Sequence, residues 1–222
     1  MSARSLDGPR LAPATGGRAR QLVVLLHGYG ASGDDLIGLG SQWARRLPDA
    51  AFVAPHAPER LEQSAFGGFQ WFGLVSLSPA EMAAGVERAA PALDAFLDSE
   101  LARHGLTGGR LALVGFSQGT MMALQVGLRR QPGPAAIIGY SGVIAAPERL
   151  ASECRARPPV LLVHGEDDPV IPATALHMTR VSLAAAAIPV EWHIRPGLGH
   201  GIDADGLALG ERFLRQTLGD TR

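Results

Sequence analysis

Short apolar runs alternate with longer amphipathic segments along the whole chain. The runs are rich in Leu, Val, Ile and Ala and are bounded by Gly, Pro or His. This is typical of strands that are buried on both faces of a parallel sheet. The predicted strands are residues 22–26, 51–54, 111–114, 136–140 and 160–163, with a less apolar strand at 190–195.

The longest amphipathic segment, residues 79–104, predicts a helix with one buried face, because its apolar residues recur at three- and four-residue steps. Ser78 is placed to cap the N-terminus of this helix, and Pro79 suits its first turn. Pro91 lies within the pattern, and we expect it to kink the helix or to split it in two. Further helices are predicted at residues 118–130, 173–187 and 203–218.

Strands that alternate with helices predict an α/β fold, with a mostly parallel central sheet and helices on both faces. We expect residues 1–222 to form one domain, and the first twenty residues to form an antiparallel hairpin at one sheet edge, with its turn at Gly16-Gly17. The segment 141–159 is too short for a separate cap domain. An active site should therefore be shallow and accessible, unless the 56–78 loop covers it.

Composition narrows the classes of function. The chain has 222 residues, 46% hydrophobic and 18% charged, and its net charge of −1 gives no electrostatic footprint for nucleic acid. No apolar run reaches the roughly 18–20 residues that span a bilayer, and the first twenty residues lack the apolar core of a signal peptide. Cys154 is the only cysteine, so no internal disulfide can form, and a cytoplasmic location is expected.

The candidate chemistry centres on Ser117, which stands in Gly115-x-Ser117-x-Gly119 at the end of the run 111–114. A strand that turns sharply into a helix thrusts its apex side chain outward, and flanking glycines let the two elements approach each other. The N-terminus of the next helix would stabilise negative charge at the same place. The pattern therefore predicts the nucleophile elbow of a serine hydrolase, although a glycine-bounded turn with an incidental serine also fits these five residues.

A serine nucleophile needs a base and an orienting carboxylate, which in α/β hydrolases follow it along the chain in the order acid, then histidine. An acidic turn, Glu166-Asp167-Asp168-Pro169, follows the strand at 160–163. Asp168 is the preferred acid because Pro169 restrains its backbone and it lies farthest into the turn. Asp167 and then Glu166 remain as alternatives.

The predicted base is His200, which lies in a glycine-flanked loop after the strand at 190–195. His193 falls within that strand and is interpreted as a half-buried surface group. His177 and His104 are interpreted as solvated helix positions. An acidic turn and a Gly-His loop after the two appropriate strands together favour the hydrolase hypothesis.

The oxyanion of a tetrahedral intermediate needs backbone donors. The N–H groups of Gln118 and of Tyr29, in the loop after the first core strand, are the candidates, and His27 is expected to brace that loop. The same loop matches a dinucleotide-binding pattern, Gly28-x-Gly30-x-x-Gly33. That interpretation requires an acidic residue at the end of the next strand, which here ends without one, so nucleotide binding is disfavoured.

Aromatic residues are concentrated at 66–72. Such a loop often lines an apolar binding site, so Phe66, Phe69 and Trp71 are candidate substrate-binding residues. The alternative is that the aromatics pack the loop onto the body of the protein. The pattern favours that packing role for Trp71 and Phe72, and a place at the rim for Phe66 and Phe69.

These motifs together resemble the carboxylesterase/acyl-protein thioesterase family, also called the phospholipase/carboxylesterase family. The matching pieces span almost the whole chain in order: Leu26-His27-Gly28-Tyr29-Gly30, Ala54-Pro55-His56-Ala57-Pro58, Gln70-Trp71-Phe72, Gly115-Phe116-Ser117-Gln118-Gly119, His164-Gly165-Glu166-Asp167-Asp168-Pro169-Val170-Ile171-Pro172 and Gly199-His200. The resemblance implies an α/β-hydrolase fold without a large cap domain, acting on short or medium acyl esters and in some members on thioesters. It also implies the triad Ser117, Asp168 and His200.

The chain departs from the family at two positions. Thr120 stands where a small Gly or Ala is common, so the start of the helix is expected to pack differently. Gly73 stands where many members have Asp, so loop bracing and substrate preference do not carry over. We expect a small-molecule acyl ester as the substrate and no metal or organic cofactor. Hydrolysis of an amide or C–C bond, and a non-catalytic binding protein with this fold, are the rival hypotheses, and the oligomeric state is left open.

Overall fold

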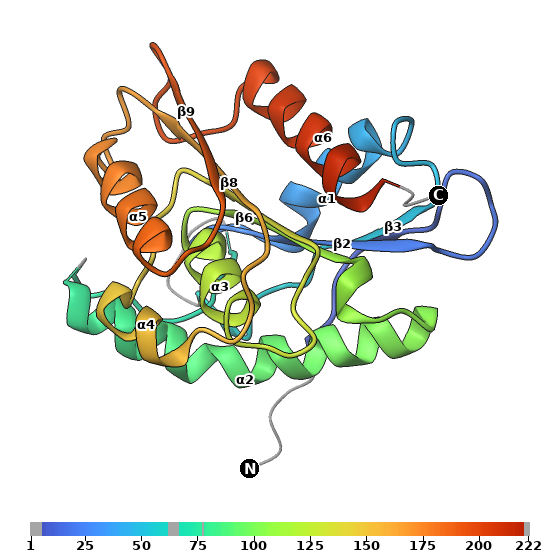
Figure 1. Cartoon of the computed structure of the whole chain (residues 1–222), viewed down its shortest axis with the longest axis horizontal. Coiled ribbons are helices and arrows are strands. Elements are labelled where there is room, and N and C mark those ends of the chain that lie inside the picture. Colours follow the sequence, from blue (N-terminus) through green and yellow to red (C-terminus); the bar gives the residue numbers. More distant parts are fainter. Residues whose placement is uncertain (1–5, 62–66, 77, 220–222) are drawn as a thin grey trace.

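The computed structural model describes residues 6–61, 67–76 and 78–219 and is built around a seven-stranded sheet (Figure 1). The strand order is β1-β3-β2-β6-β7-β8-β9, and every neighbouring pair is parallel except β1 with β3. The strands are β1 (Arg10–Leu11), β2 (Gln21–Leu26), β3 (Ala50–Val53), β6 (Leu111–Phe116), β7 (Ala136–Tyr140), β8 (Val160–Gly165) and β9 (Val190–Arg195). The six strands predicted from the apolar runs are therefore confirmed.

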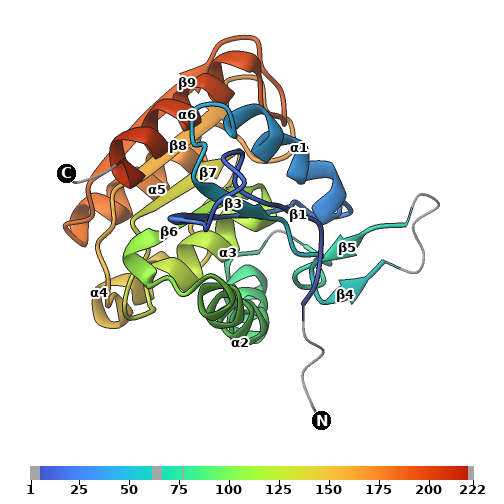
Figure 2. The same ribbon diagram turned by 90° about the vertical axis from the view of Figure 1, so that its right-hand side faces the viewer.

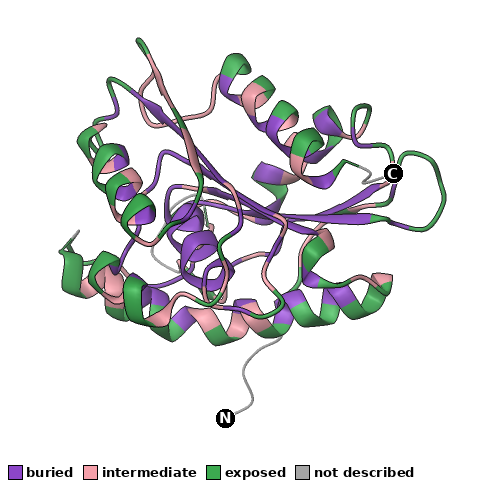
Figure 3. Ribbon diagram, viewed as in Figure 1, coloured by how far each residue is buried: buried purple, intermediate pink, exposed green. Residues whose placement is uncertain are grey.

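Helices cover both faces of the sheet (Figures 1 and 2). Successive residues of β2 show why the strands are apolar throughout: Val24 packs in a core with α2, α3 and α5, whereas Val23 packs in a second core with α1 and α6. Purple, buried positions accordingly fill the central strands and the inner helix faces in Figure 3, whereas the edge strand β9 is only partly buried. The helices are α1 (Gly33–Trp43), α2 (Pro79–His104), α3 (Gln118–Gly127), α4 (Leu150–Glu153), α5 (Thr174–Ala185) and α6 (Ala204–Leu218), with 3-10 turns at Gly108–Arg110 and Pro147–Arg149.

Three local expectations need correction. The N-terminal segment does not form a hairpin among its described residues, because β1 pairs with β3, which is distant in sequence. Pro91 does not split α2, which is continuous from Pro79 to His104. The helix α1 was not expected, although Ser32 and Asp35 form a capping box at its start.

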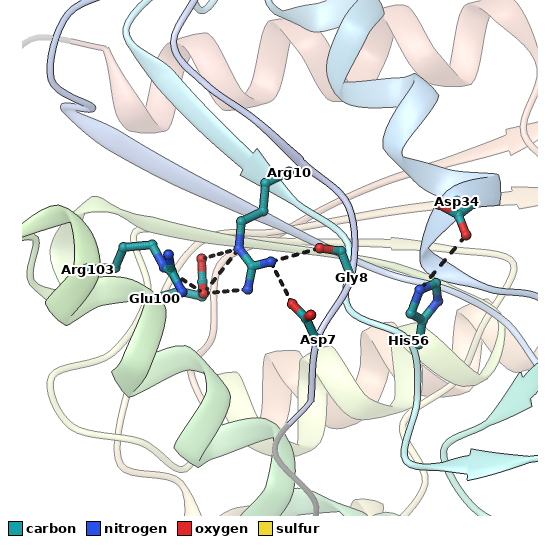
Figure 4. Close-up of polar contacts among 7 residues, drawn as sticks. All are labelled: Asp7, Gly8, Arg10, Asp34, His56, Glu100 and Arg103. Atoms are coloured by element: carbon teal, nitrogen blue, oxygen red, sulfur yellow. Dashed lines mark hydrogen bonds and ion pairs between the residues drawn. The ribbon is translucent and has the colours of Figure 1, made fainter.

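The 56–78 loop also contains structure that the sequence pattern did not indicate. Strands β4 (Glu59–Arg60) and β5 (Phe69–Gln70) form a small antiparallel pair outside the main sheet. The edge strand β1 is fastened to α2 by Arg10, which binds the buried carboxylate of Glu100 at 2.9 Å (Figure 4).

Candidate active site

Ser117 lies between β6 and α3 and has backbone angles of φ 52° and ψ −116°. An L-residue rarely adopts this conformation, which costs of order 1–3 kcal/mol. The glycines on either side are sterically required. A Cβ on Gly115 would lie 2.3 Å from the carbonyl oxygen of Gly119, and a Cβ on Gly119 would lie 1.9 Å from that of Leu26. The strained turn thus brings the start of α3 into direct contact with the end of β2.

Thr120 fits this turn because two neighbouring residues lack side chains. A Cβ on Gly142 would lie 2.3 Å from the Cβ of Thr120, and a Cβ on Gly139 would lie 2.5 Å from its Cγ2. The Thr120 hydroxyl lies 2.9 Å from the carbonyl oxygens of both Gly115 and Tyr140. The larger residue therefore ties the elbow to the end of β7.

His200 binds Asp168, with 2.8 Å between Nδ1 and Oδ2. The other carboxylate oxygen, Oδ1, accepts the N–H groups of Val170 at 2.8 Å and Ile171 at 2.9 Å. Burial opposes the charge on Asp168, but the hydrogen bonds from His200, Ile171 and Val170 outweigh it and hold the pKa of the carboxyl below its usual value. Asp168 is therefore an ionised acceptor that fixes the imidazole of His200.

The structure distinguishes among the candidate acids and bases. Asp167 and Glu166 are exposed, whereas the Asp168 side chain is fully buried against His200. His193 binds Glu191 at 2.8 Å, and His177 packs against Trp192. Neither histidine contacts Asp168.

The His200 loop is held against the elbow from two sides. The N–H of Asp167 donates to the carbonyl of Leu198 at 3.0 Å, and the hydroxyl of Ser141 donates to that of Gly201 at 3.2 Å. The ring of His200 lies 5.0 Å, centroid to centroid, from that of Phe116, the residue before Ser117. Among the described residues the Ser117 hydroxyl has no hydrogen-bond partner, and the side-chain hydrogen bond of the His200 imidazole is the one to Asp168. The serine and the imidazole are therefore not hydrogen-bonded in this structure. Such a bond is often long before substrate binds.

The loop after β2 lies beside the serine. A Cβ on Gly28 would lie 3.0 Å from the Phe116 ring and 3.2 Å from the Ser117 Cβ, a tight contact that glycine avoids. Within the described part of the chain, no acceptor is bound by the backbone N–H of Tyr29 or of Gln118. Both candidate oxyanion donors are thus free. The glycines of the dinucleotide-like pattern also have packing roles, since a Cβ on Gly33 would lie 1.9 Å from the carbonyl oxygen of Ala54.

The aromatic loop is divided between packing and exposure. Trp71 and Phe72 are buried, and the Trp71 indole donates to the His27 carbonyl at 3.0 Å, so the structure favours the packing role for both. Phe69 is partly exposed and stacks on His56 with 4.8 Å between ring centroids. The candidate Phe66 lies outside the described residues.

Two polar contacts at the site were not predicted from the sequence. The Gln118 side chain accepts the Trp71 N–H at 2.8 Å and donates to the Phe72 carbonyl at 2.8 Å, so it fastens the aromatic loop to the elbow. The buried His164 donates from Nε2 to the Ile171 carbonyl at 2.8 Å and lies 3.2 Å from the Asp168 carboxylate. The position of His164 at the end of the strand before the acidic turn was the sequence signal from which its contact with Asp168 could have been predicted.

The loop that contains Gly73 is held by a side chain of α2. The Glu81 carboxylate accepts the N–H groups of Val75 at 2.6 Å and Ser76 at 2.7 Å. The Val75 bond and those from Ser76 lower the pKa of Glu81. A charged side chain in the first turn of α2 thus braces this loop.

A largely apolar pocket of about 280 Å³ lies next to the Asp168 turn. Val170 and Ile171 line it from the turn itself, and Met121 lines it from the first turn of α3, after Ser117. Other lining residues are Met82, Ile144 and Met178. The pocket is near the lower end of the size range of small-molecule sites.

Sequence comparison gives consistent matches over nearly the whole chain. A model of the family described as Phospholipase/Carboxylesterase matches residues 13–218. Acyl-protein thioesterase 1 from Gibberella zeae is 28% identical over 233 residues, which cover 96% of this chain and 98% of that protein. Esterase YpfH from Escherichia coli strain K12 is 29% identical over 201 residues, which cover 90% and 84%.

Solved structures agree. Esterase PE8 is similar with a TM-score of 0.91 and 46% identity, over 96% of this chain and 100% of that one. SOBER1 from Arabidopsis thaliana has a TM-score of 0.77 over 90% of this chain and 100% of its own, and at 24% identity it shows the fold alone. Within the described ranges, none of the helices combines the length and the apolarity that crossing a membrane requires.

Proposed function

The chain belongs to the phospholipase/carboxylesterase family, and from this membership we propose that it hydrolyses short- to medium-chain carboxylic esters through an acyl-enzyme on Ser117. The family match and the similarity to two esterases confirm the α/β-hydrolase fold and an esterase-type hydrolase activity. The observation that carries the residue assignment is the 2.8 Å bond between Asp168 and His200, beside a serine held at φ 52°.

In the proposed mechanism the Ser117 hydroxyl attacks the ester carbonyl while Nε2 of His200 takes its proton. Asp168 stays ionised, keeps the other imidazole proton on Nδ1 and stabilises the imidazolium. His200 then gives the proton to the leaving alcohol. A water activated by the same imidazole hydrolyses the acyl-enzyme, so each group returns to its starting state.

The negative oxygen of each tetrahedral intermediate is assigned to the backbone N–H groups of Tyr29 and Gln118. Two observations support this: both groups lack an intramolecular acceptor among the described residues, and Gly28 lies against Ser117. Loss of one such donor typically costs about 3–4 kcal/mol in the transition state.

The proposed acyl site is the apolar pocket beside Asp168. Its volume of about 280 Å³ and its Met and Ile lining favour a short or medium aliphatic chain over a bulky one. Thioesters are included in the proposal because relatives named acyl-protein thioesterase 1 match along their length. A cytoplasmic location is proposed from the single cysteine, which excludes an internal disulfide.

The decisive experiment compares Ser117→Ala and His200→Ala with the unmodified protein on a p-nitrophenyl ester series, with thioesters and amides alongside. We expect kcat/KM to fall by roughly 10⁴-fold or more without a change in circular dichroism. Labelling by a fluorophosphonate probe should disappear in Ser117→Ala. Ser152→Ala, an exposed serine on α4, is the matched control. Near-normal esterase activity in Ser117→Ala would overturn the assignment, and amide turnover without ester turnover would favour the rival activity.

A further inference from the structure

Two histidines that do not belong to the proposed triad join the loop after β2 to the loop after β3. His27 follows β2, and its Nε2 accepts the N–H of Ala57 at 2.9 Å. His56 follows β3, and its Nδ1 accepts the N–H of Gly33 at 3.2 Å. Each imidazole therefore binds the backbone of the other's loop. We call these two reciprocal bonds the imidazole clasp.

The tautomers of the clasp follow from its other partners. Nδ1 of His27 lies 2.7 Å from the Gly28 carbonyl oxygen, which can only accept, so Nδ1 carries the proton and Nε2 is free to accept. Burial lowers the pKa of His27, and the Gly28 bond opposes this only in part. In His56 the proton is on Nε2, which lies 3.9 Å from the Asp34 carboxylate (Figure 4).

The clasp borders the loop that presents Tyr29. The ring of His56 stacks on Phe69, whose carbonyl accepts the Gly30 N–H at 2.9 Å and whose N–H donates to the Ala31 carbonyl at 2.8 Å. Gly28, just before Tyr29, is thus bound by the His27 imidazole, and Gly30 and Ala31, just after it, are bound by the Phe69 backbone. The His56 imidazole holds the far end of the same segment through the Gly33 N–H. Tyr29 itself is half exposed, with no backbone acceptor among the described residues.

We propose that His27 and His56 are positioning residues that hold the Tyr29 N–H at the oxyanion site, an inference that rests on the proposed function. Neither touches the substrate; both act through the backbone of residues 28–33. A donor that must lie about 2.7–3.1 Å from an oxygen loses much of its effect when its loop relaxes by a fraction of that distance. The clasp also gives a physical reason why the motif pieces at 26–30 and 54–58 occur in one chain.

His56 is a better position for a test than His27, because it is partly exposed and because its hydrogen bond to Gly33 and its stack on Phe69 can be removed separately. His56→Phe keeps the stack on Phe69 and removes the acceptor. His56→Asn removes the stack, but its Oδ1 stands close to the place of Nδ1 and can still accept the Gly33 N–H. His104→Phe, at the last turn of α2 with no side-chain hydrogen bond among the described residues, is the control.

We expect His56→Phe to lower kcat by about 10-fold with KM little changed, because a misplaced oxyanion donor weakens the transition state and not the bound ester. The inhibition constant of phenylboronic acid, which forms a tetrahedral anion on the serine, should rise by a similar factor. His56→Asn should restore both values toward those of the unmodified protein. A general loss of packing would not change kcat and the boronate inhibition constant by similar factors, and His56→Asn would not restore them.

The outcomes separate the two proposals. An unmodified protein that neither cleaves esters nor reacts with the fluorophosphonate probe overturns the proposed function. An active protein whose His56→Phe variant keeps its kcat and its boronate affinity overturns the clasp alone. If His56→Phe does not fold, His27→Gln, which keeps an acceptor near the place of Nε2, is compared with His27→Leu by the same two measurements. Equal kcat in that pair also overturns the clasp.

Discussion

Replacing Ser117 by glycine should stabilise the protein relative to replacing it by alanine. Both variants remove the hydroxyl, so neither can form an acyl-enzyme in the proposed mechanism. They differ in the Cβ atom, which at φ 52° and ψ −116° stands in a conformation that only glycine adopts freely. The comparison therefore isolates the backbone strain of the elbow from its chemistry.

The magnitude follows from two opposing terms. Relief of the strained conformation contributes about 1–3 kcal/mol to the free energy of unfolding. Glycine also makes the unfolded chain more flexible, which subtracts about 0.4–1 kcal/mol. The two terms leave a net gain of Ser117→Gly over Ser117→Ala of about 0–2.6 kcal/mol, centred on about 1.3 kcal/mol. For a chain of this length the central value corresponds to a rise of about 3–5 °C in Tm.

The assay is thermal unfolding followed by circular dichroism, with urea unfolding as a second measure. Ser99, exposed in the middle of α2, is the matched control position. There the order should reverse, with Ser99→Gly less stable than Ser99→Ala by about 0.5–1 kcal/mol, because glycine weakens a helix interior. A Ser117→Gly protein that melts at or below Ser117→Ala would refute the claim that the elbow stores strain.

Three further outcomes are expected. Gly119→Ala should lower the free energy of unfolding, measured in urea, by more than about 4 kcal/mol, because the added Cβ would lie 1.9 Å from a carbonyl oxygen. The control is Gly38→Ala, whose added Cβ has no atom within 4 Å, and it should be neutral or stabilising. The lowered pKa of His27 means that the unfolded chain takes up its proton first, so urea stability should fall as pH drops below 6.5, and an unchanged stability at about pH 5 would contradict this. Ala175→Phe should fill the acyl pocket and shift the ester series toward shorter chains, whereas Ala185→Phe, at the far end of α5, should not.

Much of the fold could be predicted because the local sequence pattern of a segment matches the burial that the segment has in the tertiary structure. The strand 136–140 was predicted at its observed bounds, since a buried parallel strand must be apolar along its length. The helix at 79–104 was predicted equally well, because a cap at Ser78, Pro79 and a glycine after His104 are local signals. α1 was missed because Gly33, its first residue, was interpreted only as part of the dinucleotide-like pattern.

For the site, the sequence predicted only which residue types take part and the order in which they follow one another along the chain. A Gly-x-Ser-x-Gly turn, an acidic turn and a Gly-His loop could be assigned to strand ends, since the carboxyl ends of parallel strands share one sheet edge. The preference for Asp168 over Asp167 came from one proline, whereas its buried contact with His200 depends on two backbone N–H groups. Those contacts have no sequence signature.

By itself, then, the sequence determined the six parallel strands of the main sheet, the helices α2, α3, α5 and α6, and the side chains that could carry acyl transfer. It did so because periodicity and turn chemistry act over a few residues. Only the tertiary structure decided that β1 pairs with β3, that Gln118 fastens the aromatic loop, and that His27 and His56 bind each other's loops. These choices depend on which backbone groups are left without partners when distant segments pack, and no local pattern records that.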